Sequence, residues 1–140
     1  FLVELLRHFG LQAALEFERD GENLLFSITG EGVSALIGRH GQTLDAIQYL
    51  ANAAVNKGDD DWVRVVVDVD GYRKRREQIV TQMAHRVVGE VRRRHMALKM
   101  EPMNAAERRL VHMVVQQFAD VQSESEGDEP YRRVIIRPAR

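Results

Sequence analysis

Two short groups of residues in this sequence have the chemistry to hold an anion. The first is Gly38-Arg39-His40-Gly41, in which two glycines flank two side chains that can carry positive charge. Because glycine has no Cβ, the backbone can turn tightly there and a phosphate can approach it closely. A helix that starts near Gln42 would add outward-pointing amides and the positive end of its dipole. The spacing alone is equally typical of an ordinary turn between two helices.

The second group is Arg108 and His112, which lie one helical turn apart on a row that continues to Gln116. A guanidinium and an imidazole so placed can hold a phosphate or stack beneath a base. The spacing alone favours a structural role, with Arg108 paired to a carboxylate. Arg133 and Arg137 share one face of the last predicted strand, where they extend a basic surface toward the pair or are simply solvated.

The elements around the first group predict an α-β-β-α-α-β order over residues 1–69. Apolar residues alternate on both sides of the turn Asp20-Gly21-Glu22-Asn23, which is typical of a hairpin. A short helix then ends at Gly38, and a longer helix with one apolar face begins after Gly41. This arrangement predicts that the GxxG segment lies between two helices.

The rest of the chain predicts a second small α+β region. Asp59-Asp60-Asp61 indicate a polar turn before a valine-rich, half-buried strand over 62–69. Asn104 and Glu107 have the spacing of a capping box that opens a helix. The order α-β-α-β-β comprises a helix over 71–97, a strand near Leu98, the helix after Asn104, and strands over 121–125 and 132–137.

The string LIGRHGQTLDAIQYL, placed between two helices and after a hairpin, closely resembles the GxxG segment of a KH domain. The α-β-β-α-α-β order is that of the bacterial (type II) form of this domain. The resemblance implies that Gly38 to Gly41 form a loop that clamps the backbone of about four nucleotides. It also implies an apolar groove for the bases, lined by Ile37 and Leu44 unless these are plain core. On this view Gly41→Asp abolishes binding without changing the fold.

The strings MEPMNAAERRLVH and VQSESEGDEPYRRVIIRP are similar to the R-three-H domain, named for its Arg-x-x-x-His spacing, which binds single-stranded nucleic acid. The resemblance covers most of residues 78–140 and makes Arg108 and His112 the signature pair. A KH domain followed by this module is the arrangement of the Jag family, also called SpoIIIJ-associated protein, of bacterial RNA-binding proteins. The resemblance implies domains over 1–76 and 77–140, single-stranded RNA as ligand, a small stand-alone KH protein as partner, and a link to cell growth and division.

Composition is consistent with a folded cytoplasmic protein. The 140 residues are 44% hydrophobic and 29% charged, and they contain no cysteine, which excludes disulfides and thiolate metal sites. No apolar stretch approaches the roughly 20 residues that cross a membrane. Family members commonly carry a further N-terminal domain, and this chain begins at Phe1, so we expect a fragment.

Charge is unevenly distributed although the net charge is only −1. Residues 1–69 carry 5 basic and 11 acidic side chains, residues 70–100 carry 9 and 3, and residues 101–140 carry 6 and 7. The basic segment attracts phosphates, or it is merely a solvated helix face.

Other functions leave weaker traces in the sequence. No P-loop, GxSxG or HExxH motif occurs, and the five histidines lack the spacing of a metal site. Asp68 and Asp70 could act as paired carboxylates in metal-assisted cleavage, but they fit better as a strand end and a helix N-cap. We therefore predict no catalytic residue, cofactor or small-molecule substrate. A single-stranded DNA binder and a protein-interaction adaptor are the alternatives to RNA binding.

Overall fold

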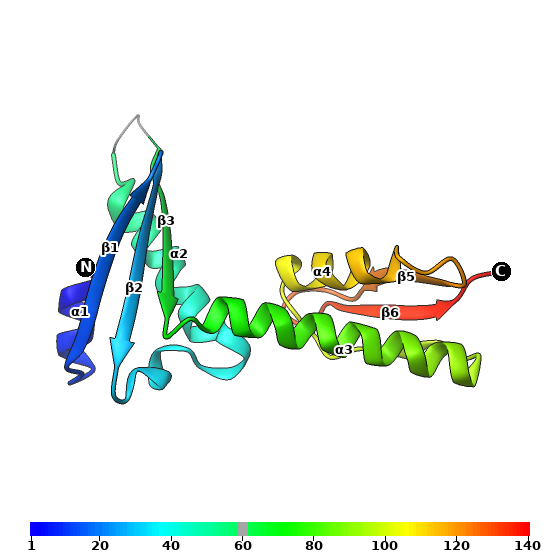
Figure 1. Ribbon diagram of the computed structural model, residues 1–140. Helices are drawn as coiled ribbons and strands as arrows, with labels where there is room; N and C mark the ends of the chain where they lie inside the picture. The colour runs from blue at the N-terminus through cyan, green and yellow to red at the C-terminus, as the bar shows by residue number, and fades with distance from the viewer. Residues whose placement is uncertain (59–61) are drawn as a thin grey trace. The chain divides into compact units, whose positions relative to one another are not determined.

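The computed structural model describes residues 1–58 and 62–140, so the predicted polar turn Asp59-Asp60-Asp61 lies outside the described residues. The described chain divides into two compact units, Phe1–Arg75 and Arg76–Arg140. Each unit has its own sheet (Figure 1), and each has its own apolar core. The predicted α+β class is confirmed.

The first unit has the predicted α-β-β-α-α-β order, except that the first of its two middle helices is only a 3₁₀ turn. The five residues between Gly32 and Gly38 leave room for only a short helix, which forms as a four-residue 3₁₀ turn, and the GxxG segment itself forms a second 3₁₀ turn. The strand order is β1-β2-β3, with β3 parallel to β2. The elements are α1 (Leu2–His8), β1 (Ala13–Asp20), β2 (Asn23–Gly30), η1 (Val33–Leu36), η2 (Arg39–Gly41), α2 (Gln42–Val55) and β3 (Arg64–Val69).

The strand register of this unit sets one apolar face toward its helices. Asp20 pairs with Asn23 across the predicted turn, and Leu15 pairs with Ile28 five residues further along each strand. Side chains alternate between the two faces of a strand, so these apolar residues point to the same side. Helices α1 and α2 lie against that face (Figure 1). The buried core is Leu2, Leu6, Ile28, Val33, Leu36, Leu44, Ile47, Ala51, Val65, Val67 and Val69.

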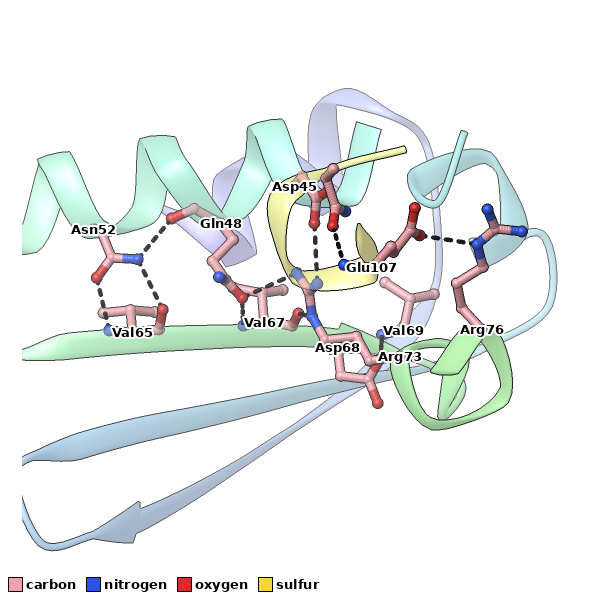
Figure 2. Close-up of polar contacts among 11 residues, drawn as sticks. Asp45, Gln48, Asn52, Val65, Val67, Asp68, Val69, Arg73, Arg76 and Glu107 are labelled. Carbon is pink, nitrogen blue, oxygen red and sulfur yellow. Dashed lines mark hydrogen bonds and ion pairs between the residues drawn. The ribbon is translucent and has the colours of Figure 1, made fainter. Parts of the chain in front are cut away.

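Side chains of α2 cover the outer edge of β3 (Figure 2). The Asn52 amide behaves like a neighbouring strand: its Oδ1 accepts from the Val65 N–H at 2.7 Å, and its Nδ2 donates to the Val65 carbonyl at 2.8 Å. Gln48 Oε1 accepts from the Val67 N–H at 3.0 Å. An open strand edge invites pairing with other chains, so these bonds protect β3 and fix its position against α2.

The second unit has the predicted α-β-α-β-β order, and its strands are arranged β4-β6-β5. The long helix ends three residues before the predicted position, because His95 adopts a left-handed conformation with φ 56°. Its elements are α3 (Tyr72–Arg94), whose first turn belongs to the first unit, β4 (Leu98–Lys99), α4 (Ala105–Val115), β5 (Val121–Glu126) and β6 (Arg133–Pro138). The buried core is Val80, Ala84, Val88, Val91, Met100, Met103, Val111, Val114, Val115, Val121, Val134 and Ile136.

Two polar contacts fix the start of α4. The Asn104 side chain accepts a hydrogen bond from the Glu107 N–H at 2.9 Å, which is the first half of the predicted capping box. The Glu107 carboxylate also accepts from Arg76 Nε at 2.9 Å (Figure 2). Arg76 and Glu107 are both more than nine-tenths buried, so this ion pair ties α3 to α4 in the interior of the unit.

Candidate nucleic-acid interface

The GxxG segment is a tight turn whose backbone depends on its glycines. Gly38 and Gly41 have φ of 71° and 81°, and His40 between them also has a positive φ, 54°. A Cβ on Gly38 would lie 2.1 Å from Thr43 Oγ1. A Cβ on Gly41 would lie 2.8 Å from the Tyr72 ring. Both glycines are therefore required by the local conformation and packing, whether or not a ligand binds.

Because of this packing, a charged substitution at Gly41 would disturb the fold as well as any ligand binding. Gly41 is buried, and a side chain there would have to displace Tyr72, which packs against the core of the unit. The expectation that Gly41→Asp leaves the fold unchanged is therefore wrong. Substitutions of Arg39 and His40 are a cleaner test of the loop, since the Arg39 side chain is exposed and His40 is half-buried.

The backbone amides at the start of α2 are largely engaged within the turn. The Gln42 N–H donates to the Arg39 carbonyl, and the Leu44 N–H donates to the Ile37 carbonyl at 3.1 Å. The predicted set of outward-pointing amides is thus not available at these two positions. The groups that this loop still offers to an anion are mainly the exposed Arg39 guanidinium and the positive end of the α2 dipole.

The apolar groove implied by the KH resemblance is only partly accessible. Leu44 has no exposed surface and belongs to the core, so it offers nothing to a base. Ile37 is half-buried and packs against the same core. Of the two apolar residues predicted for the groove, only Ile37 has surface that a ligand can touch.

The basic segment is extensively paired with carboxylates. Arg73 donates from Nη1 to Asp45 at 3.0 Å and from Nη2 to Gln48 at 2.9 Å (Figure 2). Arg93 holds the pKa of Glu90 below its usual range by a hydrogen bond, so Glu90 stays ionised. Such pairing lowers the positive charge that this segment offers to phosphates. The ion pairs of residues 70–100 include Arg73–Asp45, Arg76–Glu107, Arg92–Asp120, Arg93–Glu90, Arg94–Glu90 and Lys99–Glu126.

Arg108 lies mostly inside the second unit. Only 8% of the residue is exposed, and its Nη1 donates to the Met103 carbonyl at 2.7 Å and contacts the Glu129 carboxylate at 2.9 Å. Arg108 therefore links the segment before α4 to the connection between β5 and β6. This agrees with the structural alternative, in which the arginine is paired with a carboxylate.

His112 is held by two serines of β5. Its Nδ1 lies 2.7 Å from Ser123 Oγ, and its Nε2 lies 3.0 Å from Ser125 Oγ. Burial lowers the pKa of the imidazole, and the neighbouring Arg108 charge lowers it further. At neutral pH His112 is thus an uncharged group, and it adds no positive charge for a phosphate.

The lowered pKa makes the stability of this unit sensitive to acid. After unfolding, His112 regains its usual pKa of 6.5 and binds a proton more readily than in the fold. Its contribution to stability is therefore complete above that value and is lost as pH falls through the lower pKa of the folded state. The free energy of unfolding should decline more from pH about 8 to about 5 in the natural chain than in His112→Gln, measured with urea. If the free energy of unfolding falls equally with pH in the two proteins, His112 does not have a lowered pKa in the fold.

A hollow of about 520 Å³ lies beside the signature pair on α4. Arg108 and His112 line it together with exposed Arg109, exposed Met113, and Arg132 from just before β6. Sequence reasoning did not single out Arg109, Met113 or Arg132 for this site. The available signal for Arg109 and Met113 was their helical spacing, one position after Arg108 and His112. For Arg132 the signal was the alternation of side chains along the last strand.

Arg133 and Arg137 lie on the other face of the sheet. Ser123 and Ser125, which contact His112, pair in register with Ile136 and Val134, whose side chains enter the core. Because successive strand residues point to opposite faces, the two arginines face away from the pair. Arg137 forms an ion pair with Glu124 on that opposite face. The expectation that Arg133 and Arg137 extend the surface of the signature pair is therefore wrong.

The two aspartates considered for a nuclease lie at the end of β3 and in the turn between β3 and α3. Asp68 Oδ1 accepts from the backbone N–H groups of Val69 and Arg73, so it stabilises the turn into α3. Asp70 adopts a left-handed conformation with φ 51° at that turn. Across residues 1–58 and 62–140, no group of three or more histidines, cysteines, aspartates or glutamates could hold a metal ion.

Comparison with known protein families matches one domain family to each unit. Residues 1–69 match the family described as "KhpA/KhpB, KH domain", and residues 78–138 match the R-three-H domain. The chain therefore contains a KH domain followed by an R-three-H domain. It belongs to the Jag family, which has this domain order.

Curated relatives match the chain across both of its units. RNA-binding protein KhpB of Clostridium symbiosum is 35% identical over 129 residues, which is 92% of this chain and 58% of that protein. The proteins of the same name from Lactiplantibacillus plantarum and Bacillus subtilis are 33% and 31% identical, over 97% and 79% of this chain and 42% and 54% of their own lengths. The chain thus spans about half the length of these relatives. In the described part of the chain, no helix is long and apolar enough to cross a membrane.

Proposed function

We propose that this protein binds single-stranded RNA through two surfaces, one in each unit. The first is the loop from Gly38 to Gly41, with exposed Arg39 as its main phosphate contact. The second is the hollow beside His112. The observation that carries the proposal is the occurrence of a GxxG turn and an Arg-x-x-x-His pair in folds that match two nucleic-acid-binding families. Relatives named RNA-binding protein KhpB support it.

Titration with matched oligonucleotides at several salt concentrations tests this function. Each phosphate contact on a single strand should steepen the fall of log affinity with log salt by about 0.7. We expect labelled single-stranded RNA to bind with such a slope, and the DNA of the same sequence to bind several-fold more weakly, because DNA lacks the 2′-OH. Tighter binding of DNA would reassign the ligand. No RNA binding at low salt would reject the proposal and favour a protein-interaction adaptor.

The cellular setting is part of the same proposal. We place the protein in the cytoplasm, in post-transcriptional regulation linked to growth or division, with a small stand-alone KH protein as partner. The first unit offers such a partner an apolar hollow of about 190 Å³. Phe1, Val3 and Val55 border it and are all more than one-third exposed. Exposed apolar surface of this kind is typical of interaction sites.

A further inference from the structure

We infer that Arg108 and His112 position the RNA surface of the second unit, and that Arg109, Met113 and Arg132 beside them contact the ligand. The inference rests on the proposed function and assigns its residues. In this arrangement the hollow on α4 takes one nucleotide of a single strand. The phosphate of that nucleotide lies against the guanidinium groups of Arg109 and Arg132.

The contacts of Arg108 explain why it is assigned a positioning role. Its Nη1 already serves the Met103 carbonyl and the Glu129 carboxylate, and its side chain is only 10% exposed. A phosphate that bound Nη1 would have to displace both partners, which is costly, and only a tenth of the Arg108 side chain is exposed for any other contact. Arg108 instead fixes the connection between β5 and β6, from which Arg132 enters the hollow.

His112 supports the same surface from the side of the helix that faces β5. Both of its ring nitrogens are within hydrogen-bond distance of serine hydroxyls, so no ring nitrogen is left without a partner. These bonds join α4 to β5 and hold the helical turn that carries Arg109 and Met113. The imidazole is a neutral spacer that sets the distance between the helix and the sheet.

The residues assigned to the ligand are accessible and converge on one place. Arg109 and Met113 lie one turn apart on α4, Gln116 is the C-cap residue of the same helix, and all three are exposed. Arg132 borders the hollow from the β6 side, and its Nη1 is fixed by the Gly127 carbonyl at 2.7 Å. Two guanidinium groups suit a phosphate, the thioether chain of Met113 offers an apolar surface to a base, and the Gln116 amide can donate to or accept from its edge.

The slope of affinity against salt separates contacting from positioning residues. We expect Arg109→Gln and Arg132→Gln each to weaken binding of labelled single-stranded RNA about threefold to tenfold, and each to lower the salt slope by about 0.7. Arg108→Gln should weaken binding while the slope stays unchanged, because no phosphate contact is lost. Arg133→Gln is the matched control: it lies next to Arg132 but on the opposite face of the sheet, and it should change neither quantity.

Each outcome of this experiment has a separate meaning. If the natural chain binds RNA but Arg109→Gln and Arg132→Gln leave the slope unchanged, the inference is overturned while the proposed function stands. A slope lost with Arg108→Gln would place the signature arginine on a phosphate and also overturn it. Absence of binding by the natural chain rejects the proposed function itself. If Arg108→Gln unfolds the unit, the slopes of the Arg109 and Arg132 variants still decide the matter.

Discussion

Arg39→Asp combined with His40→Asp should lower the affinity for single-stranded RNA roughly 10- to 100-fold. The double variant removes the exposed guanidinium of the GxxG turn and places two carboxylates where a phosphate has to pass. A charge-assisted hydrogen bond is worth about 1.5–3 kcal/mol, and each 1.4 kcal/mol is a factor of about ten in affinity. Fluorescence anisotropy with a labelled oligonucleotide at physiological salt measures the effect.

The fold should tolerate this pair of changes. Arg39 is exposed, and the left-handed conformation of His40, with φ 54°, is one that aspartate adopts more readily than most residues. Far-UV circular dichroism should therefore match that of the natural chain. Gly41→Asp lacks this advantage, since its side chain would collide with Tyr72.

A control of equal charge distinguishes a local contact from the general charge of an acidic unit. Lys57→Asp with Arg64→Asn also changes the net charge by three, at the other end of α2. A 14-residue helix is about 20 Å long, well beyond the Debye length of about 8 Å at physiological salt. We expect this control to alter affinity less than about twofold. Equal losses in the two variants would remove the loop from the binding surface.

The fold could be predicted because local patterns and long-range packing agree over most of the chain. The turn at Gly21, the apolar faces of the helices and the valine-rich strand each specify one element, and those elements appear where expected. The exceptions follow from short range effects. The short segment between Gly32 and Gly38 forms a 3₁₀ turn, and the left-handed His95 ends α3 early.

The candidate site was harder to predict, because it depends on which side chains are already occupied. The Arg-x-x-x-His spacing identifies Arg108 and His112, but it cannot show that Met103, Glu129 and two serines hold them. Those partners lie up to 21 positions away in the sequence. The positive count over residues 70–100 was misleading for the same reason, since its arginines pair with distant carboxylates such as Asp45 and Asp120.

The face of β6 could have been predicted correctly from the sequence. Alternation separates Arg132 from Arg133, and the apolar residues Val134 and Ile136 identify the core side. Arg132 shares that side with them, so it was the better candidate for a surface next to α4. The basic face with Arg133 and Arg137 lies away from the signature pair because α4 covers the face that carries Val134 and Ile136.

The buried pair of Arg76 and Glu107 should have the largest effect on stability. Arg76→Met leaves the Glu107 carboxylate more than nine-tenths buried without its guanidinium partner, and Glu107→Leu leaves the opposite charge. Breaking one side of a buried ion pair costs about 3–5 kcal/mol. A unit of 65 residues has little stability to lose, so either variant should be substantially unfolded in that unit. Urea titration followed by far-UV circular dichroism measures the loss.

The double variant Arg76→Met with Glu107→Leu separates the cost of an unpaired charge from the value of the pair itself. Two apolar side chains of similar volume need no desolvation of charge, so replacing both partners is often neutral or stabilising. We expect the double variant to recover most of the stability that each single variant loses. If the double variant is as unstable as the sum of the two single changes, the charges act independently and the pair does not hold α3 to α4. Because Glu107 precedes Arg108 and Arg109 on α4, recovery of the fold should also recover the RNA affinity of the second unit.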